Sequence, residues 1–138
     1  METSTPARPE TSRGPWLTLW PLRLLLTVHL VAVLAQPVLA GRYLSGDVDA
    51  IAVHATIGGT LAAVGLVVIA ATLLYVLGGR GKLWAAPVSV ALFLAVGIQI
   101  GAGYSRDLGL HIPLGVAIVV ASVLLAIWVW SPSAGRAR

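Results

Sequence analysis

Cysteine is absent from this chain, and its single methionine is Met1. Without thiols there can be no disulfide bond, thiolate metal site, iron–sulfur cluster or covalently attached c-type haem. Because methionine is confined to the first position, a thioether axial ligand is excluded as well. Any metal or cofactor must therefore be held by other side chains.

Charged residues are scarce: they make up 10% of the 138 residues, whereas 58% are hydrophobic. A soluble domain of this length cannot bury so much apolar surface. Four segments contain no charged residue, namely 24–41, 50–79, 83–105 and 108–135. Each is near or above the roughly 20 residues that a membrane-spanning helix needs. The sequence predicts an all-α, four-helix transmembrane up-down bundle over residues 16–130, with spans at about 17–41, 50–78, 83–104 and 108–130.

Acidic residues are missing from all four segments. Carboxylate-bridged metal centres and acidic proton relays therefore have no side chains to use. Serine and threonine are scattered along the spans rather than aligned into a pore stripe, and no phosphate-binding loop or nucleophile elbow is present. We predict no catalytic residue, and we expect an electron carrier or accessory protein rather than a stand-alone enzyme.

Basic residues flank the predicted spans on one side of the membrane. They are Arg8, Arg13, Arg23, Arg80, Lys82, Arg136 and Arg138. The opposite loops mix both signs of charge, through Arg42, Asp47, Asp49, Arg106 and Asp107. The positive-inside rule therefore places both termini in the cytoplasm of a multi-pass cell membrane protein, and no nucleic-acid partner is expected. The tryptophans all fall at the same interface, at Trp16, Trp20, Trp84, Trp128 and Trp130.

The two polar tails, residues 1–15 and 131–138, have too little apolar surface to fold, and we expect both to be disordered and cytoplasmic. For the first span a second interpretation stays open. Its basic flank, its apolar run and the Val38-Leu39-Ala40 sequence before Gly41 are also compatible with a cleavable signal peptide. Cleavage would leave three spans and would discard Gln36.

The opposite side of the predicted bundle contains an internal repeat. The first hairpin reads Gln36, Gly41-Arg42-Tyr43, a loop and His54-x-x-x-Gly58, and the second reads Gln99, Gly103-Tyr104-Ser105-Arg106, a loop and His111-x-x-x-Gly115. The ordered set of Gln, Gly, Tyr with Arg, and His-x-x-x-Gly thus occurs twice. We interpret the bundle as two duplicated helical hairpins.

The repeated residues fall at similar depths. At about 1.5 Å per residue, His54 and His111 lie roughly 5–6 Å inside the outer ends of the second and fourth helices. Gln36 and Gln99 lie roughly 7–8 Å inside the ends of the first and third, so each helix places one polar side chain in a single layer. The second and fourth helices of such a bundle are diagonal, about 11–14 Å apart. This separation is too wide for the imidazoles to touch and suits two imidazoles that hold one metal at the centre of a flat macrocycle.

Haem b fits this arrangement. Gly58 and Gly115 fall on the same helix face as the histidines and one turn deeper, where a missing side chain lets a porphyrin approach the backbone. The residues just above, where propionates would reach water, are Arg42, Tyr43, Tyr104 and Arg106. Arginine can bind a carboxylate through two parallel hydrogen bonds. We therefore predict a cofactor site made of His54 and His111 as metal ligands with Gly58, Gly115, Arg42, Arg106, Tyr104, Gln36 and Gln99 around them.

Purely structural roles stay open for the same residues. Two neutral histidines hydrogen-bonded to hydroxyls or carbonyls, glutamines that bridge helices and glycines at close helix contacts would also lock a bundle. The two loop arginines would then lie at lipid head groups. On that interpretation the chain is a haem-free accessory or assembly subunit of a membrane complex. A small transporter or a quinone-binding enzyme is a third class, in which His29 and the glutamines matter and no pigment is bound.

His29 does not belong to the predicted layer. It lies about 18 Å below the outer end of the first span, near the middle of the membrane. No second histidine shares its depth, so a second bis-histidine haem is not supported. His29 is either a buried hydrogen-bonding residue or a proton or substrate contact beneath the haem.

Over the motifs from Gln36 to Gly58 and from Gln99 to Gly115, the chain resembles small four-helix membrane haem proteins of the cytochrome b type. It is similar in particular to half of heme A synthase and to uncharacterised actinobacterial four-helix membrane proteins. The resemblance implies axial ligation by His54 and His111. Because the Glu-x-x-His signature of the synthase is missing, it does not extend to haem modification. The function expected is electron transfer or haem handling in the lipid bilayer, with a redox partner or a larger membrane complex.

Overall fold

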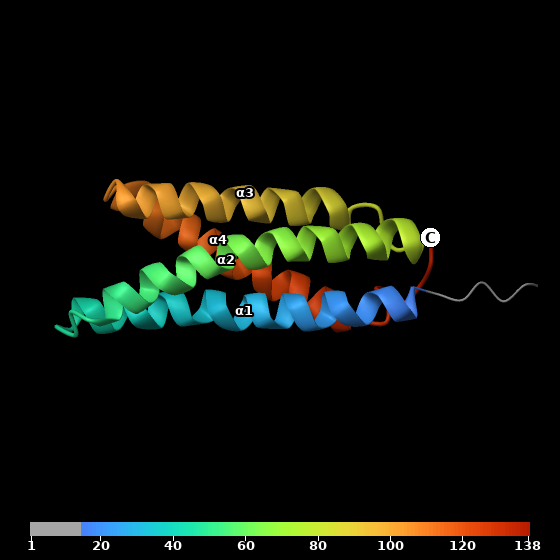
Figure 1. Cartoon of the computed structure of the whole chain (residues 1–138), viewed down its shortest axis with the longest axis horizontal. Coiled ribbons are helices and arrows are strands. Elements are labelled where there is room, and N and C mark those ends of the chain that lie inside the picture. The colour runs from blue at the N-terminus through green and yellow to red at the C-terminus, as the bar shows by residue number, and fades with distance from the viewer. Residues whose placement is uncertain (1–14) are drawn as a thin grey trace, which may run out of the picture.

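The computed structural model describes residues 15–138 and contains four long helices (Figure 1). They are α1 (Trp16–Leu44), α2 (Ala50–Leu73), which continues as the π-helical turn η1 (Leu74–Gly78), α3 (Ala85–Tyr104) and α4 (Leu108–Trp130). All four are long and apolar enough to cross a membrane, and residues 15–138 contain no strand. The predicted all-α transmembrane bundle is therefore confirmed, with α1 reaching three residues beyond the predicted end of the first span.

Each helix packs against two neighbours, so that α2 and α4 are diagonal to each other, as are α1 and α3. The connections 45–49 and 105–107 lie at one end of the bundle, which we call the loop end. Pro15, the connection 79–84 and the C-terminus lie at the other, which we call the terminal end (Figure 1). Consecutive helices therefore run in opposite directions, as an up-down bundle requires.

Buried residues recur along every helix at alternating spacings of three and four, which is the spacing of side chains that interdigitate between nearly parallel helices. On α1 they are Leu19, Leu22, Leu26, His29 and Val33, and on α4 they include Ile118, Ser122, Leu125 and Val129. On α2 and η1 they include Leu61, Gly65, Val68, Thr72 and Tyr75, and on α3 they include Ala85, Ser89, Leu92 and Val96. Small residues outside this spacing, among them Ala71, Ala102 and Ala126, are buried as well. The core therefore consists of layers to which each helix contributes one side chain.

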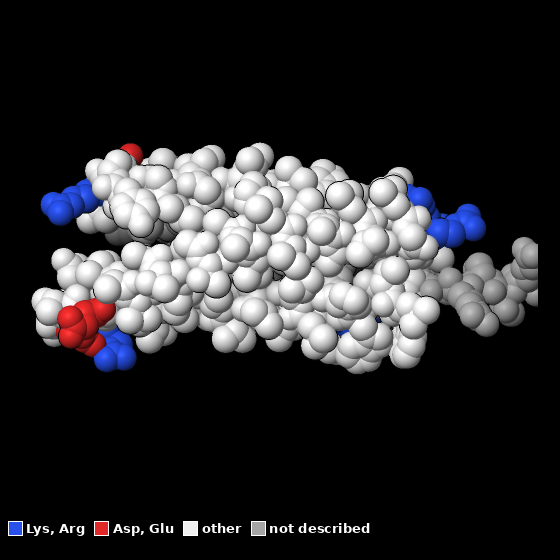
Figure 2. Space-filling view, in the orientation of Figure 1, with Lys and Arg blue, Asp and Glu red and all other residues white. Residues whose placement is uncertain are grey.

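Continuing the same spacing toward the loop end leads to the repeated residues of the sequence. The next core positions are Gln36 on α1, Gly58 and His54 on α2, Gln99 and Gly103 on α3, and Gly115 and His111 on α4. All of these residues are only half-buried. The two hairpins diverge here, and Figure 2 shows a notch between them at the loop end. The last core layers are therefore filled by histidine, glutamine and glycine rather than by large apolar side chains.

The terminal end is closed by the C-terminal residues. The hydroxyl of Tyr75 donates a hydrogen bond to the Ala134 carbonyl at 2.9 Å and accepts one from the Lys82 amide at 3.2 Å, and both Tyr75 and Ala134 are fully buried. The disorder expected for residues 131–138 is therefore wrong, because these contacts hold the tail against η1. The same expectation for the N-terminal tail falls on residues 1–14, which lie outside the described residues, and on Pro15.

All five tryptophans lie at the terminal end, as the sequence predicts. Arg23 is fixed among them: its Nε donates to the Val129 carbonyl at 3.0 Å, and its guanidinium lies 5.2 and 5.1 Å from the ring centres of Trp20 and Trp130. The charged side chains also differ between the two ends of the bundle (Figure 2). The acidic residues of the described chain, Asp47, Asp49 and Asp107, all lie at the loop end, whereas the terminal end carries basic residues.

Candidate functional site

The two repeated histidines meet across the diagonal of the bundle. The ring centres of His54 on α2 and His111 on α4 are 6.1 Å apart, and their planes are tilted by 52°. Both residues lie in the first turns of their helices at the loop end. The helix diagonal alone would place them further apart, so both side chains extend inward from the core positions that the three-four spacing assigns to them.

Each histidine is anchored to the other helix of its own hairpin. Nδ1 of His54 lies 3.2 Å from the carbonyl oxygen of Gln36, and Nδ1 of His111 lies 2.9 Å from that of Gln99. A carbonyl oxygen can only accept, so Nδ1 is the donor in both contacts, and in a neutral ring Nε2 then holds the free lone pair. This is the state in which imidazole binds a metal, with its second nitrogen donating to a carbonyl. The equivalent contact in both hairpins also fits their interpretation as a duplication.

The distance between the rings suits a single metal between them. A transition metal binds an imidazole nitrogen at about 2 Å, and that nitrogen lies roughly 1 Å from its ring centre. Two imidazoles on opposite sides of one metal therefore have ring centres about 6 Å apart. The 6.1 Å between His54 and His111 is close to that value.

Two histidines are too few to hold a bare metal ion. Within residues 15–138 no group of three or more His, Asp or Glu side chains is placed to bind one. A cofactor that brings most of its own ligands needs only axial donors from the protein. The donor set therefore fits a metal held in a macrocycle.

Glycine and glutamine form the layer next to the histidines. A Cβ on Gly115 would lie 2.9 Å from Nε2 of Gln99, and one on Gly58 would lie 4.0 Å from Oε1 of Gln36. The space above each glycine is thus occupied by a glutamine side chain, and a porphyrin that reaches Gly115 has to displace an amide. Nε2 of Gln36 and Oε1 of Gln99 are buried without a hydrogen-bond partner in the described structure, so neither atom would lose a hydrogen bond on displacement. We call His54, His111, Gln36, Gln99, Gly58 and Gly115 the histidine layer.

The residues predicted to meet the propionates all lie at the loop end, but they differ in their surroundings. Arg42 forms an ion pair with Asp47 at 2.6 Å. Arg106 is exposed and has a left-handed backbone, with φ of 59°, and no acidic partner contacts it within the described residues. Tyr104 is 78% exposed. Of the two arginines, Arg106 is therefore the one whose guanidinium is available.

Gly103, which the sequence marks only as part of the repeat, is a further residue of the site. A Cβ at this position would come within 3.0 Å of Cε1 and 3.2 Å of Nδ1 of His111. Its counterpart in the first hairpin, Gly41, has nothing within 4 Å. The three-four core spacing of α3, which runs from Val96 through Gln99 to Gly103, is the signal that identifies it.

His29 lies apart from the histidine layer, as predicted. It is 2% exposed in the middle of α1, and neither ring nitrogen has a hydrogen-bond partner in the described structure.

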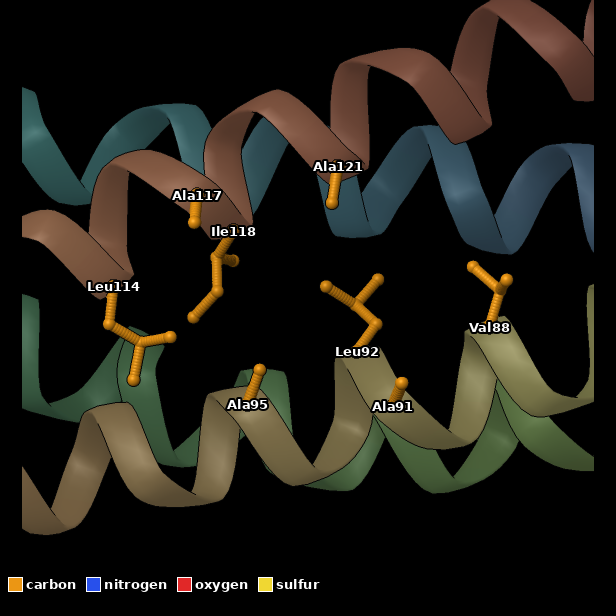
Figure 3. A pocket seen from close by; sticks show the side chains of 8 residues that line it. All are labelled: Val88, Ala91, Leu92, Ala95, Leu114, Ala117, Ile118 and Ala121. Carbon is orange, nitrogen blue, oxygen red and sulfur yellow. The ribbon is translucent and has the colours of Figure 1, made fainter.

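A groove of about 220 Å³ runs between α3 and α4 (Figure 3). It is lined entirely by apolar side chains, namely Val88, Ala91, Leu92, Ala95, Leu114, Ala117, Ile118 and Ala121. It contains no group that could bind a metal or transfer a proton. Its chemistry is that of a lipid-facing helix contact between small residues.

No protein-family model, curated protein or solved structure matches the chain. Its function must therefore be argued from its own residues.

Proposed function

We propose that this integral membrane protein binds one haem b between α2 and α4, with His54 and His111 as the two axial ligands. The observation that supports this most directly is the approach of the two imidazoles to 6.1 Å, with Nδ1 of each donating to a backbone carbonyl. This geometry leaves both Nε2 atoms for one iron. Gly58 and Gly115 bring no side chain of their own beside it, and the glutamine amides above them would have to move aside.

The glutamine carbonyls have a defined task in this proposal. By accepting the Nδ1 protons, the Gln36 and Gln99 carbonyls fix the tautomer and orientation of both rings and make the ligating nitrogens more basic. A backbone carbonyl in a helix cannot move independently of the helix. The ligand geometry is therefore set by the packing of each hairpin.

A haem with two protein ligands supplies one-electron chemistry without an open coordination site, which favours electron transfer over reactions with oxygen. Arg106 would pair with a propionate at the loop end, and Arg42 would do so only on release from Asp47. A single haem near one face cannot carry electrons across about 30 Å of hydrocarbon. Transfer across the membrane therefore requires a redox partner or a larger complex.

The charge distribution supports an orientation. The basic residues gathered at the terminal end support an orientation with both termini in the cytoplasm by the positive-inside rule. The haem then lies near the outer face of the cell membrane. Tryptophans at the terminal end would anchor the bundle at the inner interface.

The test is the absorption spectrum of the purified protein in its oxidised and dithionite-reduced forms, with haem supplied during expression. We expect a sharp reduced α-band in the wild type that is lost in both His54→Ala and His111→Ala. His29→Ala, which removes the third histidine below the layer, should retain the band. A colourless wild type would contradict haem binding and leave the haem-free accessory role, in which the same histidines only join the helices.

A further inference from the structure

Below the histidine layer, the bundle contains a second pair of buried polar side chains without partners. His29 on α1 and Ser122 on α4 are each 2% exposed. Both ring nitrogens of His29 lack a hydrogen-bond partner in the described structure, and so does the Oγ of Ser122. Both occupy core positions in the three-four pattern, so both side chains face the interior of the bundle.

Helical rise puts the two residues at similar depths. The Arg23 side chain donates a hydrogen bond to the Val129 carbonyl, which brings these two positions of α1 and α4 close together. His29 is six residues beyond Arg23 and Ser122 is seven residues before Val129. At about 1.5 Å per residue in antiparallel helices, they lie roughly 9 and 10.5 Å from that contact, toward the loop end.

Ser122 differs from the other buried hydroxyl residues of the core. The hydroxyl of Thr72 donates to the Val68 carbonyl at 2.8 Å, and that of Ser89 donates to the Ala86 carbonyl at 2.9 Å. Both are therefore satisfied within their own helices, as hydroxyls in membrane helices commonly are. The Ser122 hydroxyl makes no such bond and is available to another group.

The surroundings of the pair are apolar except for Ser89, whose hydroxyl is already bonded within α3. One turn toward the loop end, each helix contributes one buried apolar side chain, namely Val33, Leu61, Val96 and Ile118. Toward the terminal end the neighbouring buried side chains include Leu26, Val68 and Leu125. In the hydrocarbon region an unsatisfied polar group costs several kcal/mol, and no lipid atom can satisfy it. A small molecule that both donates and accepts hydrogen bonds is the partner these groups require.

We propose that His29 and Ser122 bind a water molecule in the middle of the membrane. A neutral imidazole offers one donor and one acceptor and a hydroxyl offers both, which meets the two to four polar partners that a buried water needs. The apolar layer of Val33, Leu61, Val96 and Ile118 separates this water from the histidine layer. The site does not depend on haem binding.

The experiment uses the full chain labelled with ¹⁵N-histidine in lipid nanodiscs. The protein has three histidines, so the ring signals can be assigned by comparison with His54→Ala and His111→Ala. The measured quantity is magnetisation transfer from water to the ring N–H of His29. The variants are Ser122→Ala, which removes one side of the site, and the control Ser89→Ala, which removes a buried hydroxyl that is already bonded within α3.

We expect transfer to His29 in the wild type, its loss in Ser122→Ala and its retention in Ser89→Ala. Three results would overturn the proposal: no transfer in the wild type, transfer that survives Ser122→Ala, or loss in both serine variants. The first would mean that the site is dry, the second that water is held without Ser122, and the third that any change in packing removes it. None of these readouts depends on a Soret band, so this inference and the haem proposal can fail separately.

Discussion

Gly103 and His111 face each other across the second hairpin so closely that a methyl group on residue 103 would lie 3.0 Å from the imidazole. We predict that Gly103→Ala shifts the ring and weakens haem binding by about 1 kcal/mol, or roughly fivefold. The matched control is Gly41→Ala in the first hairpin, where the same methyl group meets no atom within 4 Å. Titration of haem into the two purified variants measures their haem affinities. Equal affinities would show that the His111 ring is not confined by α3.

The two glycines that follow the histidines should respond differently to the same substitution. At Gly58 a Cβ has room, 4.0 Å from the nearest atom of Gln36, and replacing a helical glycine by alanine stabilises by about 0.5–1 kcal/mol. At Gly115 it would lie 2.9 Å from the Gln99 amide, which must move. We expect Gly58→Ala to raise the midpoint of thermal unfolding in detergent and Gly115→Ala not to raise it. The opposite order would contradict this placement of the glutamines.

Arg23 should contribute more to stability than the ion pair at the loop end. Its removal in Arg23→Ala breaks a hydrogen bond to Val129 and two cation–π contacts, with an expected loss of about 1–3 kcal/mol. The exposed Arg42–Asp47 pair should contribute less than about 1 kcal/mol, as measured with Asp47→Asn. Denaturant titration in micelles measures the free energy of unfolding of both variants. A larger effect of Asp47→Asn would show that Arg23 is not fixed between the tryptophans.

The Tyr75 hydroxyl holds the C-terminal residues against η1. Tyr75→Phe leaves the Ala134 carbonyl and the Lys82 amide without this partner, which we expect to destabilise the contact by about 1–3 kcal/mol. Amide hydrogen exchange in residues 131–138 should then accelerate at least about fivefold, since 1 kcal/mol is roughly that factor. Tyr43→Phe, at an exposed tyrosine of the loop end, is the control. Unchanged exchange would mean that the tail is held by other contacts.

Much of the fold follows from the sequence because charge is excluded from the hydrocarbon region. The four uncharged segments therefore locate the helices, although α1 begins at Trp16, before the first uncharged segment. Because helical rise is nearly constant, the sequence also brings His54, His111, Gln36 and Gln99 together at the loop end. In the structure the glutamines lie against Gly58 and Gly115, in the layer next to the histidines. Pro15 and the C-terminus lie at the same end because the number of spans is even.

Three features depend on atoms or contacts that residue identity does not reveal. Gln36 and Gln99 meet the histidines through backbone carbonyls, which every residue type has. Tyr75 and Ala134 are 59 residues apart, and nothing in the polar tail indicates that it packs. Arg42 is paired with Asp47 while Arg106 is not paired among the described residues, although both loops carry both charges. The distance between the imidazoles depends on rotamers as well as on helix spacing.

The central claim is that both histidines bind the same iron, and electron paramagnetic resonance of the oxidised, haem-loaded protein tests it most directly. The account predicts a low-spin signal in the wild type, because two imidazoles complete the coordination of the haem. It predicts that His54→Ala and His111→Ala each convert any haem that remains to a high-spin, five-coordinate form. A high-spin wild type, or a low-spin signal that survives either substitution, would contradict it.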